Sequence, residues 1–99
     1  MQTKYVRVLC DVHFKWVENF PRYRVFVNNE LFTERTWIWN NEYYLEEALQ
    51  IEAVPGEYQI VFQPIDNSGA ELKIKNPRID AGPAVMHKHL RLEILNENA

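Results

Sequence analysis

The chain is poor in the residues that staple small domains or give the backbone unusual freedom. It has 99 residues and one cysteine, Cys10, so an internal disulfide is excluded and side-chain packing must hold the fold. Three glycines and a hydrophobic content of 46% are typical of a globular protein rather than a disordered one. No apolar run approaches the ~20 residues that cross a bilayer, so no membrane partner is expected. We expect a single domain over residues 1–99, with a frayed tail at 96–99.

Positive charge and catalytic signatures are also scarce. The net charge is -3 and neither half is strongly basic, so nucleic acid, which needs a concentrated positive field, is not expected as a partner. The polar start after Met1 lacks the apolar run of a secretory signal, so we expect a soluble protein made in a cytoplasm. There is no Gly-x-Ser-x-Gly motif, and Cys10 sits in an apolar alternating stretch where a thiolate is poorly stabilised. We therefore expect neither an enzyme nor a required cofactor.

What the sequence has throughout is side-chain alternation with a period of two, which is typical of β-strands. The first run places five apolar residues on one side, namely Val6, Val8, Cys10, Val12 and Phe14. Further runs cover residues 22–28, 30–39, 43–54, 57–65, 70–74 and 87–95. Pro21, Asn28-Asn29, Pro55-Gly56 and the segment around Pro77 interrupt them as turn signals. Seven to eight short strands predict an all-β fold, an antiparallel β-sandwich of jelly-roll-like type.

The segment Tyr43 to Val54 is the one ambiguous element. Its Glu, Ala, Leu and Gln residues are good helix formers. With a period of two, its apolar residues share one side except for Glu47, which does not fit that side. We favour a strand, because the segment has no N-cap and runs directly into Pro55-Gly56.

The stretch RTWIWNNEYY concentrates rings between Arg35 and Tyr44. In a strand, Trp37 and Trp39 point to the same side. We expect the opposite side, with Phe32 and Ile38, to face the core, so that the tryptophans are displayed. The candidate binding residues are then Arg35, Trp37, Trp39, Tyr43 and Tyr44. Core packing of Trp37 and Trp39 is the interpretation that we weigh more heavily, since tryptophan is usually largely buried, and both interpretations stay open.

Acidic and amide side chains gather in the expected turns. Those with oxygen ligands suited to calcium are Asn29, Glu30, Asp66 and Asp80. Turn chemistry alone also explains them, because Asn and Asp side chains bond their own backbone in turns. Both interpretations stay open.

The segments YRVFVNNELFTERTWIW and EYYLEEALQIEAVPGEYQIVFQPIDNSGAELKIKNPRIDAG follow an order of strand, polar turn, strand, Pro-Gly turn, aromatic strand and acidic loop. In this rhythm the chain, from Tyr23 to Gly82, resembles the small calcium-dependent xylan-binding modules and related jelly-roll carbohydrate-binding domains. It departs from them at Asn28-Asn29, where those modules have Asp-Gly, and at Asp80-Ala81-Gly82, where their Asp-Gly is split. The resemblance implies that their acidic loop falls on Asp66 and Asp80.

The same rhythm is similar to short sandwich proteins of tailed phages, including cyanophages, which serve as virion or decoration components. This resemblance implies a non-enzymatic structural or assembly protein, located in a virion, that acts through a protein partner or self-association. The alternative is a carbohydrate-binding module that holds a polysaccharide on an aromatic platform with the help of calcium.

Overall fold

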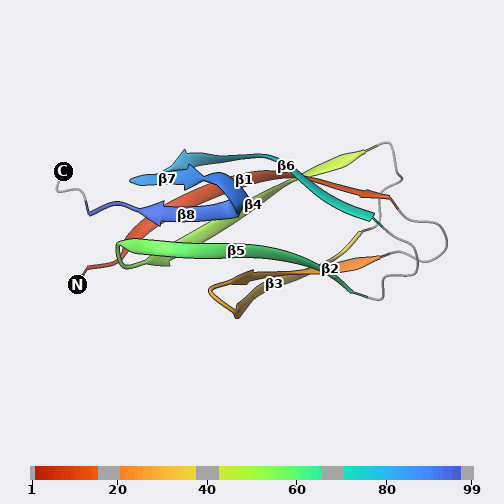
Figure 1. The fold of residues 1–99 in the computed structure, drawn as a ribbon, viewed down its shortest axis with the longest axis horizontal. Helices are drawn as coiled ribbons and strands as arrows, with labels where there is room; N and C mark the ends of the chain where they lie inside the picture. The colour runs from red at the N-terminus through yellow and green to blue at the C-terminus, as the bar shows by residue number, and fades with distance from the viewer. Residues whose placement is uncertain (1, 16–20, 38–42, 66–70, 97–99) are drawn as a thin grey trace.

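The computed structural model describes residues 2–15, 21–37, 43–65 and 71–96. Within them lie eight strands and one short 3-10 turn (Figure 1). The strands are β1 (Lys4–Lys15), β2 (Arg22–Val27), β3 (Glu30–Thr36), β4 (Tyr44–Ala53), β5 (Gly56–Ile65), β6 (Glu71–Ala81), β7 (Ala84–His87) and β8 (Arg91–Ile94), with η1 (Lys88–Leu90) between the last two. No helix among the described residues is long and apolar enough to span a membrane.

The strands form two antiparallel sheets that pack face to face, which confirms the predicted sandwich. One sheet has three strands in the order β4-β1-β6, and the other has five in the order β3-β2-β5-β8-β7. The core between them contains the five apolar residues expected on one side of β1, all of them buried. Leu49 and Ile51 of β4 and Ile60 of β5 join them from both sheets. Period-two alternation therefore gives each sheet one apolar face, and the two faces bury each other.

The ambiguous segment is a strand, as predicted. β4 pairs with β1 without a register shift from Lys4 opposite Ala53 to His13 opposite Tyr44. A β-strand satisfies the pattern because Leu49 and Ile51 then fall on the buried face. The same alternation also puts Glu47 on that face, where it is buried. The residue that did not fit the pattern therefore occupies the core of the sandwich.

The hairpin between β2 and β3 turns at Asn28 and Asn29, which have positive φ values of 49° and 70°. Both values suit a two-residue turn whose twist matches the flanking strands, as the sequence predicted. The side-chain amide of Asn28 continues the ladder beyond the turn: its Oδ1 accepts the Gln59 N–H at 2.7 Å. The Asn28 N–H donates to the Gln59 carbonyl at 2.9 Å. The hairpin tip is thus attached to the middle of β5.

A β-bulge in this hairpin changes which residues of β3 face inward. Phe26 pairs with Leu31 but Val25 pairs with Thr33, so Phe32 is the extra residue. From Thr33 onward the odd-numbered residues of β3 face the core with Tyr23 and Val25 of β2. The expected inward orientation of Phe32 is wrong, and its side chain is exposed.

β6 continues through the segment that the sequence predicted to interrupt it. Its register with β1 shifts twice, between the partners Arg78 and Lys75 and again between Ala81 and Ile79. These bulges let the strand pass Pro77 and still pair, because the residues without a ladder partner are placed at the shifts. At its end, Gly82 has φ +96° and lies so close to β1 that an added Cβ would be 2.3 Å from the Tyr5 carbonyl oxygen.

The last predicted strand, residues 87–95, is broken at η1. His89 and Leu90 have positive φ values of 62° and 58°, so the chain turns there instead of remaining extended. The pieces on either side pair as the β7–β8 hairpin, with Met86 opposite Leu92. Only β8 contributes fully buried side chains, Leu92 and Ile94.

Candidate functional site

Trp37 belongs to the core, so the displayed tryptophan platform is wrong for this residue. It is completely buried, and its ring lies 6.2 Å from that of Phe14 across the sandwich. Tyr23 of β2 lies at the same distance from Phe14, so three large rings fill one part of the core. The bulge at Phe32 is the physical reason, because it turns Trp37 toward the core. Trp39 lies outside the described residues.

Arg35 does not lie beside an aromatic platform but forms an ion pair with a buried carboxylate. Its Nε donates to Glu47 Oε1 at 2.9 Å, and its Nη2 donates to Glu47 Oε2, also at 2.9 Å. The Tyr23 hydroxyl donates to Oε1 at 2.9 Å. Arg35 and Tyr23 come from the five-stranded sheet and Glu47 from the three-stranded one. The cluster therefore connects the two sheets at the level of the Trp37 ring.

The electrostatics of this cluster keep Arg35 and Tyr23 protonated, because the pKa of each is raised. Hydrogen bonding to Glu47 raises the pKa of Arg35, against the effect of partial burial. Burial raises the pKa of Tyr23, and the neighbouring carboxylate raises it further, so the phenol stays protonated and remains a donor. Both oxygens of Glu47 are occupied by donors, which leaves the carboxylate poorly placed to take a proton from a substrate. The cluster acts as a structural connection. Burial likewise raises the pKa of the Cys10 thiol to about 11, which makes it a poor nucleophile near neutral pH.

The two tyrosines of the expected platform are exposed. Tyr43 is 60% exposed and Tyr44 is 58% exposed. Tyr44 faces away from the core on the three-stranded sheet, where its ring stacks on His13 of β1 at 5.2 Å and 19°. Trp37 faces inward, so the structure does not bring Tyr44 and Trp37 into one platform.

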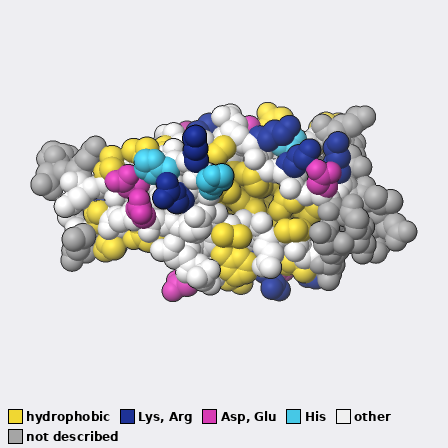
Figure 2. Space-filling model, in the orientation of Figure 1, with side chains coloured by type: hydrophobic (Ala, Val, Ile, Leu, Met, Phe, Trp, Pro, Cys, Tyr) yellow, Lys and Arg dark blue, Asp and Glu magenta, His cyan; other side chains and the backbone are white. Residues whose placement is uncertain are grey.

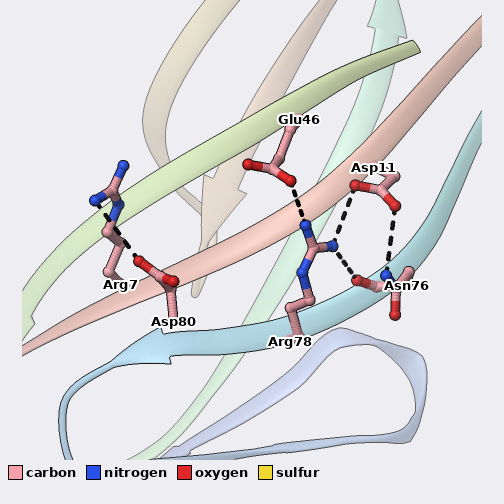
Figure 3. Close-up of polar contacts among 6 residues, drawn as sticks. All are labelled: Arg7, Asp11, Glu46, Asn76, Arg78 and Asp80. Carbon is pink, nitrogen blue, oxygen red and sulfur yellow. Dashed lines mark hydrogen bonds and ion pairs between the residues drawn. The ribbon is translucent and has the colours of Figure 1, made fainter.

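The candidate calcium ligands are separated in the fold. Asn29 and Glu30 lie at the tip of the β2–β3 hairpin, in the five-stranded sheet. Asp80 lies on β6 in the other sheet and forms an ion pair with Arg7 at 3.6 Å (Figure 3). Asp66 lies outside the described residues. Among residues 2–15, 21–37, 43–65 and 71–96, no three His, Cys, Asp or Glu side chains converge in a way that could hold a metal ion.

The outer face of the three-stranded sheet is held together by Arg78 (Figure 3). Its guanidinium reaches from β6 to Asp11 on β1, at 3.1 Å, and to Glu46 on β4. It also donates to the Asn76 carbonyl at 2.8 Å. One side chain thus joins all three strands, and hydrogen bonding to Asp11 raises its pKa. The charged side chains of Arg78, Asp11 and Glu46 are therefore paired with one another on this face.

The outer face of the five-stranded sheet is different, because it carries an apolar row. Leu31, Phe26 and Val61 lie side by side on β3, β2 and β5 in consecutive cross-strand pairs. Leu31 is 58% exposed and Val61 is 42% exposed. We call these three residues the apolar row. Figure 2 shows hydrophobic side chains on the surface near the middle of the molecule, with charged and histidine side chains beside them.

A shallow hollow of about 340 Å³ adjoins the apolar row. Its lining residues are Phe26, Asn29, Val61, Phe62, Gln63 and Pro64. One edge of the row is bordered by Arg24, whose Nε donates to Glu34 at 2.7 Å. The sequence placed Phe26 on the outward side of its strand but did not identify it as a site. The available signal was a phenylalanine where an exposed sheet face would normally carry a polar residue.

Comparisons with known proteins add no assignment. A scan of protein-family models and searches of curated proteins and of solved structures find no match to this chain. The likeness to xylan-binding modules and to phage sandwich proteins therefore stays a prediction from sequence rhythm.

Proposed function

We propose that the protein is a non-enzymatic assembly protein that binds another protein through the outer face of its five-stranded sheet. The observation that carries the proposal is the apolar row of Leu31, Phe26 and Val61, which lies across three paired strands. In the phage-type setting that the sequence rhythm implies, the partner is a structural protein of a virion.

Contiguity is what distinguishes this row from ordinary exposed apolar residues. Single exposed hydrophobic side chains are common on protein surfaces, whereas a contiguous patch with a polar border is typical of an interaction site. The row has such a border, formed by the Arg24 and Glu34 ion pair at 2.7 Å. An apolar centre with a polar rim is the arrangement found in protein interfaces. Three adjacent strands also fix these side chains on a rigid platform, so little ordering is required on binding.

The test compares two glutamate substitutions on the same outer face. Phe26→Glu places a charge in the apolar row, and Val85→Glu places one on β7, where Val85 is 39% exposed but lies away from the row. Partners that co-purify with the wild-type protein from its native source are expected to be retained by Val85→Glu. They should bind Phe26→Glu at least about tenfold more weakly, a loss of about 1.4 kcal/mol. Equal thermal unfolding of both variants excludes misfolding. Partner binding that survives Phe26→Glu would refute the proposal.

Carbohydrate binding is the second candidate, and the exposed stack of Tyr44 on His13 favours it. Sugar rings pack their C–H faces on aromatic rings, and this stack lies on an accessible strand end of the three-stranded sheet. Titration with soluble polysaccharides, with and without calcium, should shift the NMR signals of both rings. Tyr44→Ala should abolish the shift, while Tyr5→Ala, at the opposite end of the same sheet face, should leave it intact. An absence of shifts with xylan and other plant or bacterial polysaccharides would exclude this candidate.

A further inference from the structure

We infer that β4 pairs edge to edge with β4 of a second copy of this chain, so that two three-stranded sheets become one continuous six-stranded sheet. This surface differs from the apolar row, because it belongs to the other sheet. The inference therefore does not depend on the proposed function.

The first argument comes from the edges of the two sheets. A strand at a sheet edge presents unpaired N–H and C=O groups, and natural proteins protect such edges with bulges, prolines or short strands. β6 has two register shifts and Pro77. β7 has only four residues, and β3 has a bulge at Phe32. Three of the four edge strands of the described sheets therefore carry a protecting feature.

β4 has no bulge, no proline and is not short, and its inward-pointing charge, Glu47, which can also protect an edge, is paired with Arg35. It is ten residues long, contains neither proline nor glycine, and pairs with β1 without a register shift. Within the described parts of the chain, no strand pairs with its second edge. Arg35 approaches β4 from the other sheet, and its hydrogen bonds go to the side-chain carboxylate of Glu47 rather than to the β4 backbone. A long regular edge of this kind is a template for pairing with another strand.

The charges and length of β4 favour pairing with a second copy in the register centred on Ala48. The two copies of β4 would be related by a two-fold axis perpendicular to the sheet, which places outward-facing side chains of one copy next to outward-facing side chains of the other. The outward-facing residues of β4 are even-numbered, so even-numbered residues must lie opposite even-numbered residues. With Ala48 opposite its own copy, Glu46 lies opposite Gln50 and Tyr44 lies opposite Glu52, as follows from their order in β4. No two like charges then face each other across the pair.

The neighbouring registers are disfavoured. Shifting by one pair, so that Leu49 lies opposite its own copy, brings Glu46 opposite Glu52 twice. Shifting in the other direction brings Glu47 opposite itself. Like charges directly opposite each other destabilise a strand pair. The register centred on Gln50 also avoids this repulsion, but it pairs fewer residues of β4 than the one centred on Ala48. We therefore choose the Ala48 register, in which the small side chain at the axis also lets the two backbones approach.

Cysteine cross-linking tests this register directly. Residues directly opposite in an antiparallel pair have Cβ atoms ~4.5–5.5 Å apart, close to the separation that a disulfide needs. Ala48→Cys should form a covalent dimer on mild oxidation, whereas Gln50→Cys, also on the outer face, should not, because its thiol faces Glu46 of the other copy. The native Cys10 is buried and does not compete. Equal cross-linking of the two variants, or none, would overturn the inference.

Sedimentation of the uncross-linked protein gives an independent measurement. The wild-type protein should sediment as a monomer–dimer mixture whose dimer fraction increases with concentration. Ala48→Lys places two like charges at the axis and should raise the dissociation constant by up to about fivefold. Gln50→Lys adds the same charge opposite Glu46 and should not raise it. A wild-type protein that stays monomeric at all concentrations, or the reverse order of the two lysine variants, would refute the pairing of β4 with its copy.

Discussion

Removing Arg35 should expose how much the fold depends on the buried carboxylate of Glu47. In Arg35→Met, the carboxylate loses two hydrogen bonds of 2.9 Å and its positive partner, and it keeps the Tyr23 hydroxyl. Its side chain is only 4% exposed, so little water can replace the guanidinium. Breaking a buried ion pair by removing one partner costs ~3–5 kcal/mol. Because the Arg35 side chain is 39% exposed, we expect a cost below this range, ~2–3 kcal/mol.

A double-mutant cycle separates the contribution of the ion pair to the free energy of unfolding from the contribution of side-chain packing. Glu47→Leu alone leaves the arginine without its partner, and the double variant Arg35→Met with Glu47→Leu replaces the pair by apolar side chains of similar size. The double variant should be within ~1 kcal/mol of the wild type, because such replacements are often neutral. Urea unfolding followed by tryptophan fluorescence measures each free energy of unfolding, since Trp37 is buried in the core and should respond to its loss.

The matched control is Arg24→Met. Arg24 also forms an ion pair with a carboxylate, Glu34 at 2.7 Å, but the two side chains are 44% and 38% exposed. An exposed pair of this kind contributes ~0–1 kcal/mol. If Arg35→Met destabilises the protein no more than Arg24→Met, or if the two cluster substitutions are simply additive, the cluster does not hold the sheets together as argued.

Three further predictions concern single positions. Gly82→Ala should lower the free energy of unfolding by ~3 kcal/mol or more, because its Cβ would overlap β1 backbone at 2.3 Å. Gly56→Ala meets no atom within 4 Å, so only the strain of its φ of +150° remains, and it should cost less, ~1–2 kcal/mol, in urea unfolding. Asn29→Gly should be neutral or should stabilise the protein by up to ~1 kcal/mol in thermal unfolding, because glycine accepts the φ of 70° at this position. Asn28→Gly should destabilise the protein, because it removes the 2.7 Å hydrogen bond between the Asn28 side chain and the Gln59 N–H. The opposite order of stabilities would contradict the turn assignment. Burial raises the pKa of the Cys10 thiol from 9.0 to about 11, so the contribution of the thiol to stability is complete below pH 9 and is lost as the pH rises toward 11. Cys10→Val should therefore flatten the pH dependence of the unfolding free energy between pH 9 and 10. An unchanged slope would show that the thiol does not titrate in this range.

Strands whose side chains obey a strict alternation could be predicted from the sequence. β1 is the clearest case, because its five inward residues from Val6 to Phe14 are all apolar and all buried. The turn at Asn28-Asn29 could also be predicted, since few residues accept positive φ at two consecutive positions. These features depend on local chemistry alone, which is why sequence was sufficient.

The candidate site could not be predicted in the same way, because it depends on how strands meet. One extra residue at Phe32 reverses the orientation of all that follows on β3, so Trp37 is buried and Phe32 is exposed. Glu47 did not fit the apolar side of its strand, and the sequence did not show what would compensate its burial. The reason is that its partners, Arg35 and Tyr23, come from the other sheet and are distant in sequence. The apolar row was equally hidden, because its three residues become neighbours only when three strands pair in register.

The divided pairing of β5 has a consequence for how the molecule opens. Its first part, from Gly56 to Gln59, pairs with β8, and its second part, from Ile60 to Ile65, pairs with β2. Detaching the β7–β8 hairpin would break the four residue pairs with β5 and expose Leu92 and Ile94, while the ladder between β2 and β5 remained intact. Amide protons of Tyr58 and Leu92 should then exchange with solvent through a partial opening, at lower cost than those protected by the ladder between β2 and β5. Slowly and rapidly exchanging amide protons would then lie on the same strand, β5.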